Sequence, residues 1–228
     1  FIDLTAPVPS IVGTVALGVG PDSIHLTPDG LRAIVAIEDE SAAGNRQGSI
    51  QIITIDYATP SASSVKTLAL APMVGNTLSD LQPEFVDVSP DGTRAIVSLQ
   101  ENNLVAVLDL TNDTVIRYID LGTTTHTADV TANATISLTA AFTGRREADS
   151  ICFLADGHHF VTANEGDTST SGGVFSGGRG YSFFDLDGTL GENFFRLGTA
   201  RVEPPTSGVD VAIDPASLAS LTGSDYEL

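Results

Sequence analysis

A short repeat occurs three times along this chain, and it constrains the fold more than any other feature of the sequence. The copies align without gaps at residues 21–40, 83–102 and 148–167. Each copy holds a β-rich stretch, a Pro-Asp-Gly or Ala-Asp-Gly turn, and a second β-rich stretch that ends in acids and amides. Proline presets one turn position and glycine accepts a positive φ, so each copy predicts a β-hairpin.

Further strands are expected downstream of each hairpin. Third strands are predicted at 49–56, 104–110 and 181–185, and fourth strands at 65–70 and 115–121. Four antiparallel strands per unit are typical of a propeller blade. The sequence therefore predicts an all-β fold, a β-propeller that forms one domain over 1–228.

The ends of the chain predict incomplete blades. Residues 1–4 and 11–17 resemble the third and fourth strands of an earlier blade, and 209–215 resembles the opening strand of a later one. About three and a half four-stranded blades are then present, whereas closed propellers need roughly four to eight. We expect further polypeptide or another chain to complete the ring, which allows a homo-oligomer or a hetero-oligomer. The predicted blade units are 1–20, 21–82, 83–147, 148–206 and 207–228.

The spacing of the repeat indicates insertions. Successive turn glycines, Gly30, Gly92 and Gly157, lie roughly 60–65 residues apart, against ~40–45 residues in common propeller repeats. Two stretches rich in serine, threonine, alanine and glycine, 59–82 and 123–146, can hold the extra residues. We interpret both as surface excursions of the blades.

The charge of the chain restricts its partners. Ten basic residues against 29 acidic residues give a formal net charge of −19. A field of this sign repels phosphate, which argues against nucleic acid and anionic membranes as partners. Divalent cations or cationic surfaces are favoured, and solubility is the alternative reason for the acidity. The sequence has no apolar run near the ~20 residues of a membrane span, and we expect any export signal to have been removed or to lie outside this chain.

Cysteine and histidine suggest no catalytic or metal centre of their own. A single cysteine, Cys152, excludes an intrachain disulfide and any site built from several thiolates. It lies in an apolar strand pattern, so we expect it in the core. We expect His158 and His159, which follow a turn, at the surface. The segment 185–189 resembles a calcium loop, but it aligns with the end of a third strand, which favours a turn.

The topology of a four-stranded blade gathers acidic residues on one face. The entry to the first strand and the loop between the second and third strands share that face, whereas the Asp-Gly turns lie on the opposite one. Entry residues lie near the propeller axis, where converging carboxylates repel unless they are protonated, paired or bound to metal. Oxygen ligands of this kind suit Ca²⁺, which takes six to eight of them. The predicted ligands, which we call the acidic belt, are Asp22, Glu38, Glu84, Glu101, Asp149, Glu165 and Asp167.

Alternatives stay open for the acidic belt and for the loop beside it. The acids can instead face water or pair with arginines, and the candidate arginines are Arg32, Arg94, Arg145, Arg146 and Arg179. The glycine-rich loop 167–180 follows the second strand of the third unit on the same face. It is either a ligand lid or a mobile tip without a role.

Several blocks of the chain resemble a known family. They are Pro-Asp-Ser-Ile-His-Leu-Thr-Pro-Asp-Gly, Pro-Glu-Phe-Val-Asp-Val-Ser-Pro-Asp-Gly, Leu-Gln-Glu-Asn-Asn and Thr-Ala-Asn-Glu-Gly-Asp. These blocks resemble secreted bacterial propellers of the choice-of-anchor or alkaline-phosphatase-like type, and they are similar to mesenchyme-specific cell-surface glycoproteins. The resemblance implies a secreted protein located outside the cell, on the cell surface or in the periplasm.

Three functions fit these features. The first is a calcium-binding propeller module without enzymatic activity, acting in surface, matrix or assembly interactions. The second is a metal-dependent hydrolase of the phosphoesterase or lactonase type, in which central carboxylates hold a metal that activates water. The third is a purely structural subunit, which the incomplete ring suggests. Propellers host binding and catalysis alike, so the fold leaves the choice open.

Overall fold

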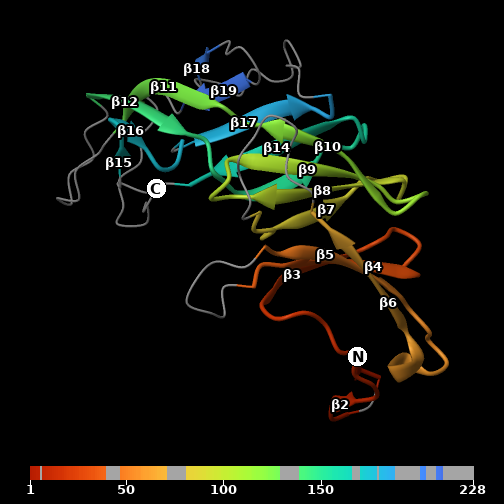
Figure 1. Ribbon diagram of the computed structural model, residues 1–228. Helices are drawn as coiled ribbons and strands as arrows, with labels where there is room; N and C mark the ends of the chain where they lie inside the picture. Colours follow the sequence, from red (N-terminus) through yellow and green to blue (C-terminus); the bar gives the residue numbers. More distant parts are fainter. Residues whose placement is uncertain are drawn as a thin grey trace. The chain divides into compact units, whose positions relative to one another are not determined.

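The computed structural model shows a chain that folds into antiparallel-rich β-sheets (Figure 1). The described residues are 1–5, 7–39, 47–70, 81–128, 139–165, 170–178, 180–187, 201–203 and 209–212. The chain forms two compact units, Phe1–Val97 with Ala106–Arg117, and Ser98–Val105 with Tyr118–Leu228. Among the described residues, the helical segment is one 3₁₀ turn, η1 at Pro60–Ala62.

The first blade is a four-stranded antiparallel sheet in the first unit. Its strands, in spatial order, are β3 (Pro21–Leu26), β4 (Arg32–Ile37), β5 (Ser49–Thr54) and β6 (Ser64–Ala69). Isoleucine, valine and alanine fill the buried positions of β4 and, apart from Gln51, those of β5, where branched side chains pack well on a pleated surface. Two short strands, β1 (Ile2–Asp3) and β2 (Ser10–Ile11), precede this sheet and pair antiparallel with each other.

The second blade repeats this order. It consists of β7 (Val86–Val88), β8 (Arg94–Leu99), β9 (Leu104–Asp109) and β10 (Thr114–Asp120). The middle strands β8 and β9 are buried along nearly their whole length. The first two blades confirm the prediction of an all-β fold built from four-stranded propeller sheets.

The third blade corrects one prediction at the end of the chain. Its sheet runs in the order β13 (Ala148–Phe153), β14 (His159–Asn164), β17 (Gly180–Asp185), β19 (Val209–Ala212) and β18 (Arg201–Glu203). We expected 209–215 to open a later blade, but β19 pairs antiparallel with β17. An alternating strand pattern is the same for an opening and a closing strand, and only the long-range pairing tells them apart.

A further sheet, which lies in the second unit, joins two segments that we had interpreted as irregular. Within the excursion 123–146, β11 (Thr123–Ala128) pairs antiparallel with β12 (Ala140–Arg145), and residues 129–138 lie outside the described residues. The glycine-rich loop supplies β15 (Thr170–Ser171) and β16 (Val174–Phe175), and the sheet order is β11-β12-β16-β15. A Cβ on Gly144 would lie 2.2 Å from the carbonyl oxygen of Gly177. The loop backbone therefore packs directly on β12 instead of forming an isolated tip.

The Asp-Gly turns form as predicted. In the first blade Gly30 has a φ of +71°, and its N–H donates to the carbonyl oxygen of Thr27 at 2.8 Å. The Asp29 carboxylate accepts from the Thr27 hydroxyl at 2.6 Å and from the N–H of Leu31 at 2.9 Å. The second blade repeats these bonds with Ser89, Asp91, Gly92 and Thr93. Each turn lies at the end of its hairpin opposite the strand entry, as the antiparallel register requires.

Two local predictions were wrong. Cys152 is exposed and not in the core, because its neighbours Ile151 and Phe153 take the buried positions of the alternating strand. His158 is exposed as predicted, but His159 is half-buried. The ring Nδ1 of His159 lies 2.6 Å from the carboxylate of Asp156 in the turn.

Candidate carboxylate site

Two members of the acidic belt, Glu38 and Glu84, come together in the first unit. Glu38 directly follows β4, and Glu84 lies just before β7. A carboxylate oxygen of one lies within 4.8 Å of a carboxylate oxygen of the other. Both side chains are partly buried. Like charges at this separation repel unless a proton, a cation or a hydrogen-bond donor compensates them.

A close backbone approach at Gly48 makes this pair possible. A Cβ on Gly48 would lie 2.4 Å from the carbonyl oxygen of Ile37 and 2.4 Å from the Cδ of Pro83. The N–H of Gly48 donates to the carbonyl oxygen of Leu81 at 2.9 Å. Any side chain at this position would wedge the segment that carries Glu84 away from the end of β4. The absence of a side chain at Gly48 therefore positions both carboxylates.

The same backbone bond fixes the acid after the second strand in two blades. The N–H of Glu38 donates to the carbonyl oxygen of Gly20 at 2.9 Å, and the N–H of Glu165 donates to that of Glu147 at 3.0 Å. Gly20 and Glu147 occupy equivalent positions of the repeat, and both have a positive φ, +68° and +41°. The repeat therefore places Glu38 and Glu165 equivalently within their own sheets.

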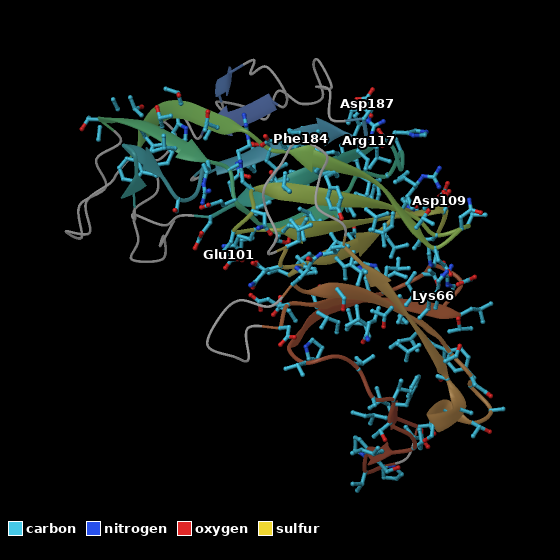
Figure 2. All side chains as sticks on the ribbon, in the orientation of Figure 1. Lys66, Glu101, Asp109, Arg117, Phe184 and Asp187 are labelled. Carbon is cyan, nitrogen blue, oxygen red and sulfur yellow. The ribbon has the colours of Figure 1, made fainter. Side chains whose placement is uncertain are left out.

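The remaining predicted ligands lie in different settings. Asp22 and Asp149 are exposed, each in an irregularity at the start of its inner strand. Glu101 is exposed in the turn between β8 and β9, at the opposite end of β9 from Asp109 (Figure 2). Asp167 lies outside the described residues. The first unit thus brings together Glu38 and Glu84, and calcium binding by the belt stays a prediction.

Sequence analysis missed a buried carboxylate in the second unit, Glu147. It is 3% exposed, and its carboxylate pairs with the guanidinium of Arg145. The N–H of Glu147 donates to the side-chain oxygen of Asn103 at 2.9 Å. Burial raises the pKa of Glu147 above its ordinary value, the Arg145 charge opposes that rise, and the nearby Glu165 carboxylate adds to it. Glu147 directly precedes β13, the first strand of the third blade, and this position is the feature of the sequence that could have identified it.

Three of the candidate arginines pair with acids outside the acidic belt. Arg32 pairs with Asp113, which also accepts from the ammonium of Lys66 at 3.2 Å. Arg94 lies 3.1 Å from Asp109. The third pair is the one between Arg145 and Glu147. These three arginines therefore pair with acids that are not predicted ligands.

Arg146 has a structural role inside the second unit. Its side chain is 1% exposed, and its Nε donates to the hydroxyl of Ser182 at 3.1 Å. Its guanidinium also donates to the carbonyl oxygen of Leu121 and lies 5.7 Å from the ring centroid of Phe184, which is labelled in Figure 2. Hydrogen bonds and a π-face are the partners that a buried guanidinium requires. Arg179 lies outside the described residues.

A comparison with protein families shows the family of this chain. The family model of the choice-of-anchor I domain matches residues 3–200. The chain belongs to this family. Membership in the choice-of-anchor I family indicates a propeller module of the extracellular or cell-surface kind, in agreement with the resemblance described above. The exact compartment, and the likeness to alkaline-phosphatase-like proteins and to cell-surface glycoproteins, stay predictions.

Three solved structures are similar to this chain at low sequence identity. The β-propeller domain of Cps50 (Swd1) from Myceliophteria thermophila matches 62% of this chain and 34% of its own, with 11% identity and a TM-score of 0.40. The PQQ domain of pyranose dehydrogenase from Coprinopsis cinerea matches 75% and 34%, with 16% identity and a TM-score of 0.43. Hydrazine synthase from Kuenenia stuttgartiensis matches 74% and 46%, with 19% identity and a TM-score of 0.37.

The choice-of-anchor I chain thus spans less than half the length of each of these structures. No curated protein matches it. Among the residues that the structure describes, no helix has the length and apolar character needed to cross a membrane.

Proposed function

We propose that this choice-of-anchor I chain is an extracellular calcium-binding propeller module that acts in surface, matrix or assembly interactions. The observation that carries the proposal is the approach of Glu38 and Glu84 to within 4.8 Å between two neighbouring blades of the first unit. Two oxygens that each lie about 2.3–2.6 Å from one Ca²⁺ ion are at most about 5 Å apart. The separation is therefore compatible with both carboxylates binding the same ion.

Calcium is favoured over magnesium by the kind of ligands at this position. Ca²⁺ accepts six to eight oxygens in flexible geometry and can complete its shell with backbone oxygens and water. Mg²⁺ requires a tighter octahedron and releases its water reluctantly. Glu101 and Asp22 stay predicted further ligands. A binding module requires only such an ion, whereas the hydrolase alternative also requires an open coordination position beside a substrate pocket.

Melting curves in Ca²⁺ and in chelator test the proposal. An ion that binds only the folded state at 100 times its Kd stabilises that state by about 2.7 kcal/mol. For a domain near this size we expect a rise in Tm of roughly 5–10 °C, and a smaller one with Mg²⁺. Glu84→Gln should remove much of the calcium-dependent shift and slightly raise the Tm in chelator, because one repelling charge is gone.

Asp29→Asn is the matched control. It removes one carboxylate charge from the turn at the other end of the first hairpin and keeps an oxygen that can accept the turn hydrogen bonds. The control should keep the calcium-dependent shift of the natural chain. Coincident curves in millimolar Ca²⁺ and in chelator, or a full shift in Glu84→Gln, would show that the pair is an ordinary hydrated surface.

A further inference from the structure

Equivalent positions of the inner strands differ sharply in exposure. Two apolar positions of the repeat alternate along each inner strand, and they are occupied by Ile24 and Leu26, Val86 and Val88, and Ile151 and Phe153. In the first blade these side chains are 60% and 50% exposed. In the second blade they are 2% and 6% exposed, and in the third 2% and 8%. The first blade therefore leaves uncovered what the other two bury.

The exposed side chains belong to an otherwise apolar face of the first blade. Ile24 lies opposite Val35 in the register, and Leu26 lies opposite Ala33, so all four share one face. Val35 and Ala33 are buried in a cluster against which Leu17 packs. The segment before β3 thus covers the middle of this face. Its inner edge, at Ile24 and Leu26, stays exposed to water.

The second blade shows what covers this edge in a neighbouring sheet. β7, which carries Val86 and Val88, contacts β3 and β4 of the first blade. The inner hairpin of one blade therefore covers the inner strand of the next. No described residue supplies such a hairpin to the first blade.

The strand pair β1 and β2 shows where the covering hairpin belongs. The pair corresponds to the third and fourth strands of a blade, and within the described residues β1 pairs only with β2. Ile2 and Ile11 face each other in this pair and are 60% and 73% exposed. A Cβ on Gly13 would lie 2.7 Å from the Cβ of Pro60, so the chain after β2 lies directly against the first blade. An edge with free backbone groups next to exposed apolar side chains is a site for strand addition.

We infer that the first blade binds a two-stranded antiparallel hairpin of the same repeat type. One strand of the hairpin pairs with the free edge of β1, and its apolar side chains cover Ile24 and Leu26. The occupant is specified by the repeat, because β3 with β4 plays this role for the second blade. It is therefore a strand, an Asp-Gly turn and a second strand, with alternating apolar residues on the face toward the first blade.

A fusion of the chain's own second hairpin tests this inference. Residues 83–106 are placed directly before Phe1, so that Asp3 follows their second strand at the spacing of Asp109 in the second blade. Asp3 and Asp109 are equivalent, because the carboxylate of each accepts from the N–H two residues later. Amide exchange at Ile2, Asp3 and Leu4 should slow by at least about tenfold, and the Tm should rise by roughly 5 °C. The control fusion carries Asp at the position copied from Ile96, and it should give neither effect. In the first hairpin the equivalent Ile34 lies opposite His25, whose ring pairs with Asp87 of the second blade, so this is the face that a hairpin turns toward the next blade.

Equal exchange and equal Tm in the two fusions would overturn the inference. The peptide 83–103 added to the unmodified chain gives a second measurement, which does not depend on the fusion folding. Slower exchange at β1 with the peptide supports the inference, and unchanged exchange at about millimolar peptide contradicts it. Light scattering tests the other possible occupant of this face, which is a second copy of the chain. A dimer of the unmodified chain that Ile24→Asp dissociates would assign this face to a second copy instead and overturn the inference.

Discussion

The first two blades share a hairpin sequence and differ in what surrounds it. Their turns make the same hydrogen bonds, from Thr27 and Asp29 in the first blade and from Ser89 and Asp91 in the second. Their inner strands nevertheless differ from 60% exposure at Ile24 to 2% at the equivalent Val86. The turn depends on residues within four or five positions, whereas burial depends on a neighbouring hairpin. The repeat therefore encodes each hairpin locally, and its neighbours decide how much each hairpin contributes to stability.

Aspartate substitutions at these equivalent positions should separate the two blades by the largest effect. Val86→Asp buries a carboxylate without a compensating positive charge. It should lower the free energy of unfolding by about 3–5 kcal/mol, which is much of the stability of a typical domain. Ile24→Asp places the charge in water and should cost no more than about 0.5 kcal/mol. Urea denaturation of both variants measures the difference.

Alanine substitutions at the same two positions allow the comparison even if Val86→Asp does not fold. Val86→Ala removes two buried methyl groups and should still cost about 1–3 kcal/mol, while Ile24→Ala should be nearly neutral. Similar costs at the two positions would mean that the inner strand of the first blade is covered in solution. In the fusion proposed above, the cost of Ile24→Asp should rise toward that of Val86→Asp.

The hairpins and the four-strand units could be predicted from sequence because their signals are local. Pro-Asp-Gly turns and branched residues such as those of 94–99 are legible within a few positions. Two pairings join segments far apart in the chain: that of β19 with β17, and that of β12 with β16. No local pattern specifies such pairings, and they were missed. Cys152 was misplaced because an apolar run conceals which residues of the alternation face inward.

The candidate site could be predicted in part for the same reason. Glu38 and Glu84 were found because they end a strand and precede another one, and the antiparallel topology brings such positions to one end of a sheet. Their actual approach depends on Gly48, whose missing side chain is significant only in the folded structure. Glu147 was missed because the equivalent residue of the first repeat is Gly20, so the alignment shows no acidic pattern there.

The third blade carries a buried glutamate, Glu147, at the position where the first blade has Gly20. Burial raises the pKa of Glu147, so folding favours its neutral form, and the natural chain should gain stability as the pH falls from 7 through the folded-state pKa. Glu147→Gln resembles the neutral form at every pH. At pH 7 it should be more stable than the natural chain by roughly 0.5–1 kcal/mol, and it should lack this gain on acidification.

Urea denaturation at pH 7 and pH 5 measures this effect. Glu101→Gln is the control, because Glu101 is exposed in the turn between β8 and β9, and the stability of this variant should change with pH as that of the natural chain does. If Glu147→Gln is instead less stable than the natural chain at pH 7, the pair with Arg145 outweighs the burial of the carboxylate. The third blade would then owe stability to a charge where the first blade has a glycine.

The smallest expected effect distinguishes the turns of the first and third blades. Partial burial of Asp156 raises its pKa, but the N–H groups of His158 and His159 and the His159 ring outweigh it and lower the pKa to about 2. A lowered acid pKa stabilises the fold above the ordinary value of 3.8, and this stability is lost as the pH falls from about 4 to 2. The carboxylate is partly exposed, so we expect only about 0.5 kcal/mol. The stability difference between the natural chain and Asp156→Asn, measured at pH 5 and at pH 2, should shrink by this amount.

Asp29 is held by a hydroxyl and one N–H without a histidine, so Asp29→Asn should show a smaller change in the same direction. A larger change at Asp29 would mean that the hydroxyl, and not the histidine ring, governs the acid stability of these turns.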